Sequence, residues 1–224
     1  MRGFLHSIYV FAGKLLCNCS LVYWEIRDKI SPPKADSILL VAHPDDDTLF
    51  FHTFIKEHKP YVVLLFTGWS LRRLPDYKKT MKYYGVRFRA YATVSDGAYY
   101  DSNRREVTKK HIRKCLNLGS FKTIAFHNAA GEYGHNTHKL VHEAVIEVCS
   151  EIKENHELLC PVKLPEIGNY PLSEKEKQDK KYIFENFYVT EKWVMTQEEA
   201  GTPIWFNNER LEKIDGNIAR NTAL

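Results

Sequence analysis

The stretch Ser37-Ile-Leu-Leu-Val-Ala-His-Pro-Asp-Asp-Asp-Thr48 decides the fold of this chain. Its first part, residues 37–41, is a short aliphatic run of the kind found in strands that are covered on both faces. Its second part changes abruptly to histidine, proline and three aspartates. In open α/β sheets, ligands bind just beyond the carboxyl ends of the strands. The stretch therefore predicts a buried parallel strand that ends at a candidate functional site.

Further apolar segments of similar length follow along the chain. We expect strands at residues 61–66, 86–94, 122–126 and 158–162, and helices at 70–84, 104–118, 138–154 and about 173–188. Strands that alternate with helices predict a parallel sheet. The expected fold is α/β and Rossmann-like, with a mostly parallel sheet and helices on both of its faces.

The length of 224 residues fits one domain with a terminal extension. We expect an aromatic, amphipathic helical extension at residues 1–35 and a domain at 36–224. The motifs lie within about 36–163, and we expect the tail, about 164–224, to pack on that core. Residues 4–24 are rich in apolar side chains, but a lysine interrupts them, whereas a spanning helix needs about 20 mostly apolar residues. A helix packed on the domain or lying on a membrane surface is favoured over an anchor.

Composition and charge exclude several classes of protein. Hydrophobic residues make up 44% and charged residues 27%, which excludes collagen-like, fully disordered and disulfide-scaffold proteins. The formal net charge of +4 is too small to indicate nucleic acid as the main partner. Five irregularly spaced cysteines indicate reduced thiols. We expect a cytoplasmic protein, with peripheral membrane contact through residues 4–24 and oligomer formation both left open.

The strand-end motif has the residue types of a metal site. His43 and Asp46 are three residues apart, so a loop that turns into a helix could aim both at one point. An imidazole and a carboxylate suit zinc or a similar first-row metal. Asp45 lies between them, and a carboxylate beside an activated water is a natural general base. The alternative is a turn whose aspartates cap the next helix.

A second motif, Gly131-Glu-Tyr-Gly-His-Asn-Thr-His138, follows the strand expected at 122–126. His135 and His138 can face one side of a first helical turn. Two groups of ligand-type side chains at equivalent strand ends are a stronger signal than either motif alone. Together they supply three metal ligands and leave a fourth position for water, which is typical of a catalytic zinc.

These two motifs resemble those of the PIG-L/LmbE-like N-acetylglucosaminyl deacetylase family, over about residues 36–163. The resemblance implies a Rossmann-like fold, zinc or another divalent first-row metal as cofactor, and removal of acetyl groups from N-acetylated amino sugars. The chain departs from the family pattern at Asp47, where the family often has Glu. It also departs at Asn136 and Thr137, where the family often has Pro-Asp.

Position by position, the resemblance implies a role for each motif residue. His43, Asp46 and His138 would bind the metal. By the same resemblance, Asp45 would be the general base, and His135 and Tyr133 would face the oxyanion or the amide carbonyl.

Two further residues match the family as candidate substrate ligands. Asp96 would hold sugar hydroxyls, although a Ser-Asp-Gly sequence also forms ordinary turns. Arg73 would contact the substrate at a helix start, although the neighbouring Arg72, Lys78 and Lys79 fit a solvated basic face equally well.

The sequence therefore predicts a metal-dependent N-deacetylase, a hydrolase of linear amides that acts on a small-molecule or lipid-linked amino sugar. One alternative is a metal-dependent amidase or esterase with a non-sugar substrate. Another is an inactive module that binds sugar or metal. A nucleotide-binding Rossmann protein ranks last, because no Gly-x-Gly-x-x-Gly motif follows the first expected strand.

Overall fold

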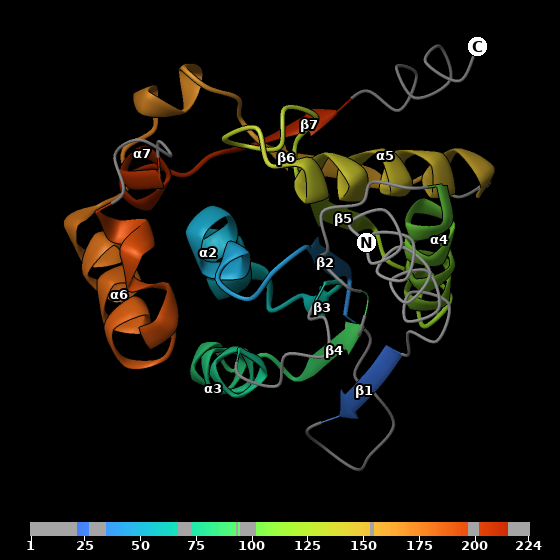
Figure 1. Ribbon diagram of the computed structural model, residues 1–224, viewed down its shortest axis with the longest axis horizontal. Coiled ribbons are helices and arrows are strands. Elements are labelled where there is room, and N and C mark those ends of the chain that lie inside the picture. The colour runs from blue at the N-terminus through green and yellow to red at the C-terminus, as the bar shows by residue number, and fades with distance from the viewer. Residues whose placement is uncertain are drawn as a thin grey trace, which may run out of the picture.

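The computed structural model describes residues 22–26 as backbone, and residues 35–66, 73–92, 94, 102–152, 155–196 and 202–214. These residues form one sheet of seven strands in the order β1-β4-β3-β2-β5-β6-β7 (Figure 1). The strands are β1 (Val22–Ile26), β2 (Ser37–Val41), β3 (Tyr61–Leu64), β4 (Phe88–Ala92), β5 (Thr123–Phe126), β6 (Glu157–Pro161) and β7 (Leu211–Ile214). Strands β2 to β6 pair in parallel, and the two outer strands pair antiparallel. The predicted mostly parallel α/β fold is confirmed.

Helices cover both faces of the sheet (Figure 1). The helices are α2 (Asp46–His58), α3 (Leu74–Tyr84), α4 (Ser102–Leu116), α5 (Asn136–Glu151), α6 (Glu174–Asn186) and α7 (Thr202–Asn207), with 3-10 turns η1 (Glu166–Asn169) and η2 (Val189–Met195). Helices α4 and α5 lie on one face, and α2, α3 and α6 lie on the other.

The central strand β2 shows why this sequence forms a covered sheet. Successive side chains of a strand point to opposite faces. Ile38 and Leu40 belong to the core beneath α4 and α5, while Leu39 and Val41 belong to the core beneath α2 and α3. All four are fully buried, so an aliphatic run without alternation is what this position requires.

The helix predicted for the N-terminal extension, residues 1–35, is wrong at residues 22–26. Val22–Ile26 form strand β1, which pairs with β4 at an edge of the sheet. These five residues are mostly β-branched or aromatic, a composition that favours strands. Residues 1–21 and 27–34 lie outside the described residues. Within the described part of the chain, no helix is both long enough and apolar enough to cross a membrane.

The tail contacts helix α2 through a fully buried lysine. Lys180 of α6 donates from Nζ to the carbonyl oxygens of Leu49, at 2.9 Å, and Trp205, at 3.2 Å. The same Nζ lies 3.1 Å from Oε2 of Glu209. Because three separate segments share one ammonium group, the tail is fixed to the helix that begins at the Asp-rich motif.

Candidate metal centre

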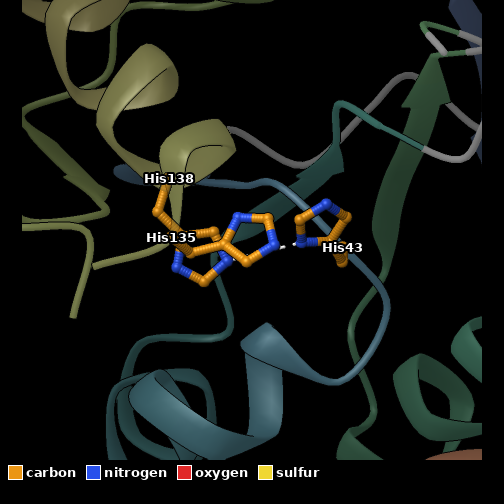
Figure 2. Close-up of side chains that lie close together, drawn as sticks. All are labelled: His43, His135 and His138. Atoms are coloured by element: carbon orange, nitrogen blue, oxygen red, sulfur yellow. Dashed lines mark hydrogen bonds between the residues drawn. The ribbon is translucent and has the colours of Figure 1, made fainter. Parts of the chain in front are cut away.

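The two motifs meet at the carboxyl edge of the sheet. Strands β2 and β5 are neighbours and run in parallel, so the segments that follow them lie side by side. Figure 2 shows the rings of His43, His135 and His138 gathered at this edge, with a dashed line between His138 and His43. His43 precedes α2, Asp46 is the first residue of α2, and the other two histidines stand at the start of α5.

Three buried ligand atoms form a triangle. His43 Nδ1, Asp46 Oδ2 and His138 Nε2 are each 3.3 Å from the other two. In a tetrahedral zinc site with metal–ligand distances of about 2.0–2.1 Å, neighbouring ligand atoms are about 3.3–3.4 Å apart. The triangle therefore fits one face of a zinc tetrahedron, and its two imidazoles and one carboxylate are suitable ligands.

Asp46 is held in its charged form. Burial alone would raise its pKa, but the charge of His138 and the hydrogen bonds from the surrounding histidines outweigh burial and hold the pKa well below its usual value. The backbone N–H of His43 also donates to Oδ2 of Asp46, at 2.7 Å. A metal ligand must be deprotonated, so this environment suits coordination.

Asp45 lies beside the triangle in a strained backbone conformation. Its φ is 97°, a backbone angle that residues other than glycine rarely adopt. Burial and the adjacent Asp46 carboxylate raise the pKa of Asp45 well above its usual value, while the charge of Arg73 opposes that rise. Among the described residues, the Asp45 side chain makes no hydrogen bond that caps α2, so the capping alternative is not supported at this residue.

Arg73 contacts Asp45. Its Nη2 donates to Oδ1 of Asp45, at 2.7 Å, and to the carbonyl oxygen of Pro44, at 2.6 Å. Its Nε lies 2.8 Å from Oε1 of Glu191 in η2. The family resemblance implied a substrate contact for Arg73, which stays a prediction, and the structure adds two carboxylate partners within this chain.

His135 and Tyr133 border the same site. His135 is the N-cap residue of α5, and its Nδ1 accepts a hydrogen bond from the Thr137 N–H at 3.2 Å. Its ring centroid lies 4.9 Å from that of His43. The Tyr133 ring lies 5.8 Å from that of His135, and burial raises the Tyr133 pKa above its usual value, so its hydroxyl keeps its proton.

A glycine allows the second motif to fold back closely. Gly131 has a φ of 70°, and a side-chain carbon on it would lie 2.5 Å from the carbonyl oxygen of His135. Glycine is therefore required both for the backbone angle and for the close approach.

Sequence reasoning missed two buried residues of the site, His127 and Glu132. His127 follows β5 directly, and its Nε2 lies 3.4 Å from Oδ2 of Asp46. Glu132 accepts from Nδ1 of both His127, at 3.0 Å, and His138, at 2.7 Å. Burial would raise the pKa of Glu132, but its histidine neighbours lower it to about 2. The rule that placed His43 at a strand end applies equally to His127 and could have found it.

Other groupings of ligand atoms are also close together. Ligand atoms of His43, His135 and His138 lie within 4.8 Å of one another, as do those of Asp46, His127 and His138. Asp96, the second predicted substrate ligand, lies outside the described residues. Its role stays a prediction.

Comparison with known proteins gives a distant relative and two similar folds. No family model matches the chain. An uncharacterized protein of Acanthamoeba polyphaga mimivirus is 23% identical over 133 residues, which are 51% of this chain and 58% of that protein's length. The chain thus spans less than two thirds of this relative.

Two solved structures share the fold. A triple mutant of a deacetylase involved in the teicoplanin biosynthetic pathway matches with a TM-score of 0.57 and 14% identity, over 72% of this chain and 85% of that one. Dbv21, an antibiotic pseudoaglycone deacetylase, matches with a TM-score of 0.53 and 13% identity, over 73% of this chain and 85% of that one. At such identities the likeness establishes a common fold.

Proposed function

We propose that this chain is a zinc-dependent N-deacetylase that hydrolyses the acetamide of an N-acetylated amino sugar of the N-acetylglucosamine type. The observation that carries the proposal is the triangle of His43, Asp46 and His138 with the Asp45 carboxylate beside it. That two proteins of the same fold are deacetylases supports the reaction type.

The triangle residues would hold the metal. A zinc ion bound there supplies an activated water as nucleophile and a positive charge beside the carbonyl oxygen. The burial of all three ligands limits solvent at the site and strengthens the electrostatic interactions within it.

Asp45 carries the proton. Its carboxylate accepts a proton from the attacking water and returns it to the nitrogen as the amide C–N bond breaks, so acetate and a free amine leave. The Arg73 bond fixes one carboxylate oxygen at 2.7 Å, which orients the carboxylate for this transfer. The raised pKa of Asp45 suits a group that must both take and return a proton.

In the proposed mechanism, His135 and Tyr133 stabilise the developing oxyanion. Because Nδ1 of His135 accepts from the Thr137 N–H, the proton of its neutral ring sits on Nε2 and can be donated. The Tyr133 hydroxyl also keeps a proton to donate. Loss of one such donor commonly reduces kcat by about 100- to 1,000-fold.

The decisive experiment compares Asp45→Asn with wild type on a panel of N-acetylated amino sugars, simple acetamides and acetate esters. Release of acetate and of free amine is measured for zinc-loaded protein. We expect turnover on acetylated sugars, and a loss of about 100- to 10,000-fold in Asp45→Asn with zinc content unchanged. Asp36→Asn is the control. Asp36 is an exposed aspartate that directly precedes β2, at the opposite end of that strand from Asp45.

Other outcomes would replace the proposal. Turnover confined to simple amides or esters would make the chain a different metal hydrolase. Zinc binding without turnover on any substrate would identify an inactive binding module. Full activity in Asp45→Asn would refute the assignment of the general base.

A further inference from the structure

Glu132 and His127 form a buried unit behind the metal triangle. Oε2 of Glu132 is the common acceptor for Nδ1 of His127 and Nδ1 of His138. The two imidazoles are stacked, with centroids 3.9 Å apart and an interplanar angle of 18°. Both rings are fully buried, and Glu132 is 2% exposed. One carboxylate thus faces the same nitrogen of two parallel rings.

The carboxylate itself is fixed by its own loop. Oε1 of Glu132 accepts from the Asn128 N–H at 2.9 Å, and the Glu132 N–H donates to Oδ1 of Asn128 at 3.0 Å. This reciprocal pair closes the turn in which Glu132 has a φ of 54°. The loop therefore sets the direction of the carboxylate before any ligand is bound.

The opposite nitrogens of the two rings have different neighbours. Nε2 of His138 belongs to the metal triangle. Nε2 of His127 instead accepts a hydrogen bond from the backbone N–H of Ala42, at 2.9 Å. That bond occupies the lone pair of His127, so this ring cannot offer Nε2 to a metal unless the bond is broken.

We propose that Glu132 is a positioning residue that fixes the tautomer of both histidines, which allows the Ala42 N–H to exclude His127 from the metal. It holds a proton on Nδ1 of each ring, and the Ala42 N–H then takes the lone pair of His127 while that of His138 stays directed at the triangle. His127 is excluded from coordination although it lies 3.4 Å from Asp46. The inference rests on the zinc site of the proposed function, and it adds the residue that sets the tautomer of both rings.

The first test measures zinc affinity by competition with a chromogenic chelator. In Glu132→Gln one carboxylate oxygen becomes an NH2 group, which faces either the Nδ1–H groups of both rings or the Asn128 N–H, so hydrogen bonds are lost in either orientation. Loss of such a supporting partner typically weakens metal binding by about 10- to 100-fold, and we expect a change in that range. Glu166→Gln, at an exposed glutamate of η1, should bind zinc as wild type does. Wild-type affinity in Glu132→Gln would overturn the inference.

The second test measures zinc stoichiometry. His127→Gln should still bind about one zinc per chain, because its side-chain oxygen can accept from the Ala42 N–H. His43→Ala and His138→Ala should each lose the zinc. Retention in His43→Ala together with loss in His127→Gln would show that His127 is the ligand and would overturn the inference.

A third test needs no variant and so is independent of altered folding. Long-range 1H–15N spectra of the wild-type protein report the tautomer of each histidine. We expect His127 to carry its proton on Nδ1 with and without zinc, and a proton on Nε2 would contradict the proposal. None of these measurements uses an acetylated sugar. Glu132-dependent zinc binding without turnover would therefore remove the proposed function and leave this inference in place.

Discussion

At the scale of single residues, the hydrogen bond between Arg73 and Asp45 should influence the pH dependence of activity. The Arg73 charge lowers the pKa of Asp45, opposing the effects of burial and Asp46. Replacing Arg73 by methionine removes that charge, so the pKa of Asp45 should rise. We expect the acidic limb of the kcat/KM profile to move about 1–3 units to higher pH. The matched variant Arg87→Met, at an exposed arginine, should keep the wild-type profile, and an unmoved limb in Arg73→Met would show that Asp45 does not control it.

A second residue, His52, makes stability depend on pH, and it lies outside the proposed metal site. Burial, together with Lys180 and Lys56, lowers the pKa of His52 from 6.5 to about 3. Its Nδ1 lies 2.7 Å from the Tyr84 hydroxyl. The unfolded chain binds a proton here below about pH 6.5, whereas the folded chain does not until about pH 3. The contribution of His52 to stability is therefore present above pH 6.5 and decreases as the pH falls.

Denaturant unfolding of wild type and His52→Asn at pH 7.5 and pH 5 tests this linkage. The variant lacks the titrating ring, so the difference in unfolding free energy between the two proteins should shrink by about 2 kcal/mol at pH 5. A difference that is constant with pH would refute it.

The residues of the site differ in how far sequence could reveal them. His43, Asp46 and His138 stand at strand ends, where ligand-type residues can be recognised one by one. Glu132 could not be assigned, because its role depends on a left-handed turn and on two rings that meet only in the folded chain. Glu191 reaches Arg73 from a segment far along the chain, and no local pattern encodes that contact.

At the scale of elements, the buried Lys180 joins α6 to α2 and to the segment after α7. Replacing it by methionine leaves Glu209 buried without its cation, and removing one partner of such a pair typically destabilises a protein by about 3–5 kcal/mol. Thermal and denaturant unfolding should show that loss for Lys180→Met. Glu209 also accepts from Thr53, so adding Glu209→Gln should recover part of it. Lys181→Met alters an exposed lysine on the same helix and should change little.

Elements were predictable where local pattern decides their structure. The five inner strands and helices α3, α4 and α5 follow from apolar runs and helical spacing, whereas no range was predicted for α2. Strand β7 could not be predicted in this way, because its four side chains are half-buried or exposed. They gain their extended conformation by pairing with β6. Strand β1 was hidden for a related reason, since it completes an edge through backbone hydrogen bonds to β4.

At the scale of the whole molecule, zinc should couple to folding, because the three proposed ligands, His43, Asp46 and His138, come from segments that follow two different strands. A ligand that binds only the folded state stabilises it by about 2.7 kcal/mol when free ligand is 100 times its Kd. For a chain of this length that corresponds to a rise in Tm of about 5–10 °C. Calorimetry with zinc and after chelation should show this shift, and His43→Ala should lack it. Equal Tm values for wild type in both conditions would mean that no zinc is bound.

The backbone of Asp45, with its φ of 97°, has a consequence for anyone who engineers this protein. A conformation of that kind typically costs about 1–3 kcal/mol, and glycine would adopt it without strain. Directed evolution that scores only heat resistance would therefore enrich glycine at this position and discard the carboxylate. Selection for stability favours glycine at residue 45, whereas selection for turnover favours aspartate. Any library built on this protein should therefore keep Asp45 unchanged.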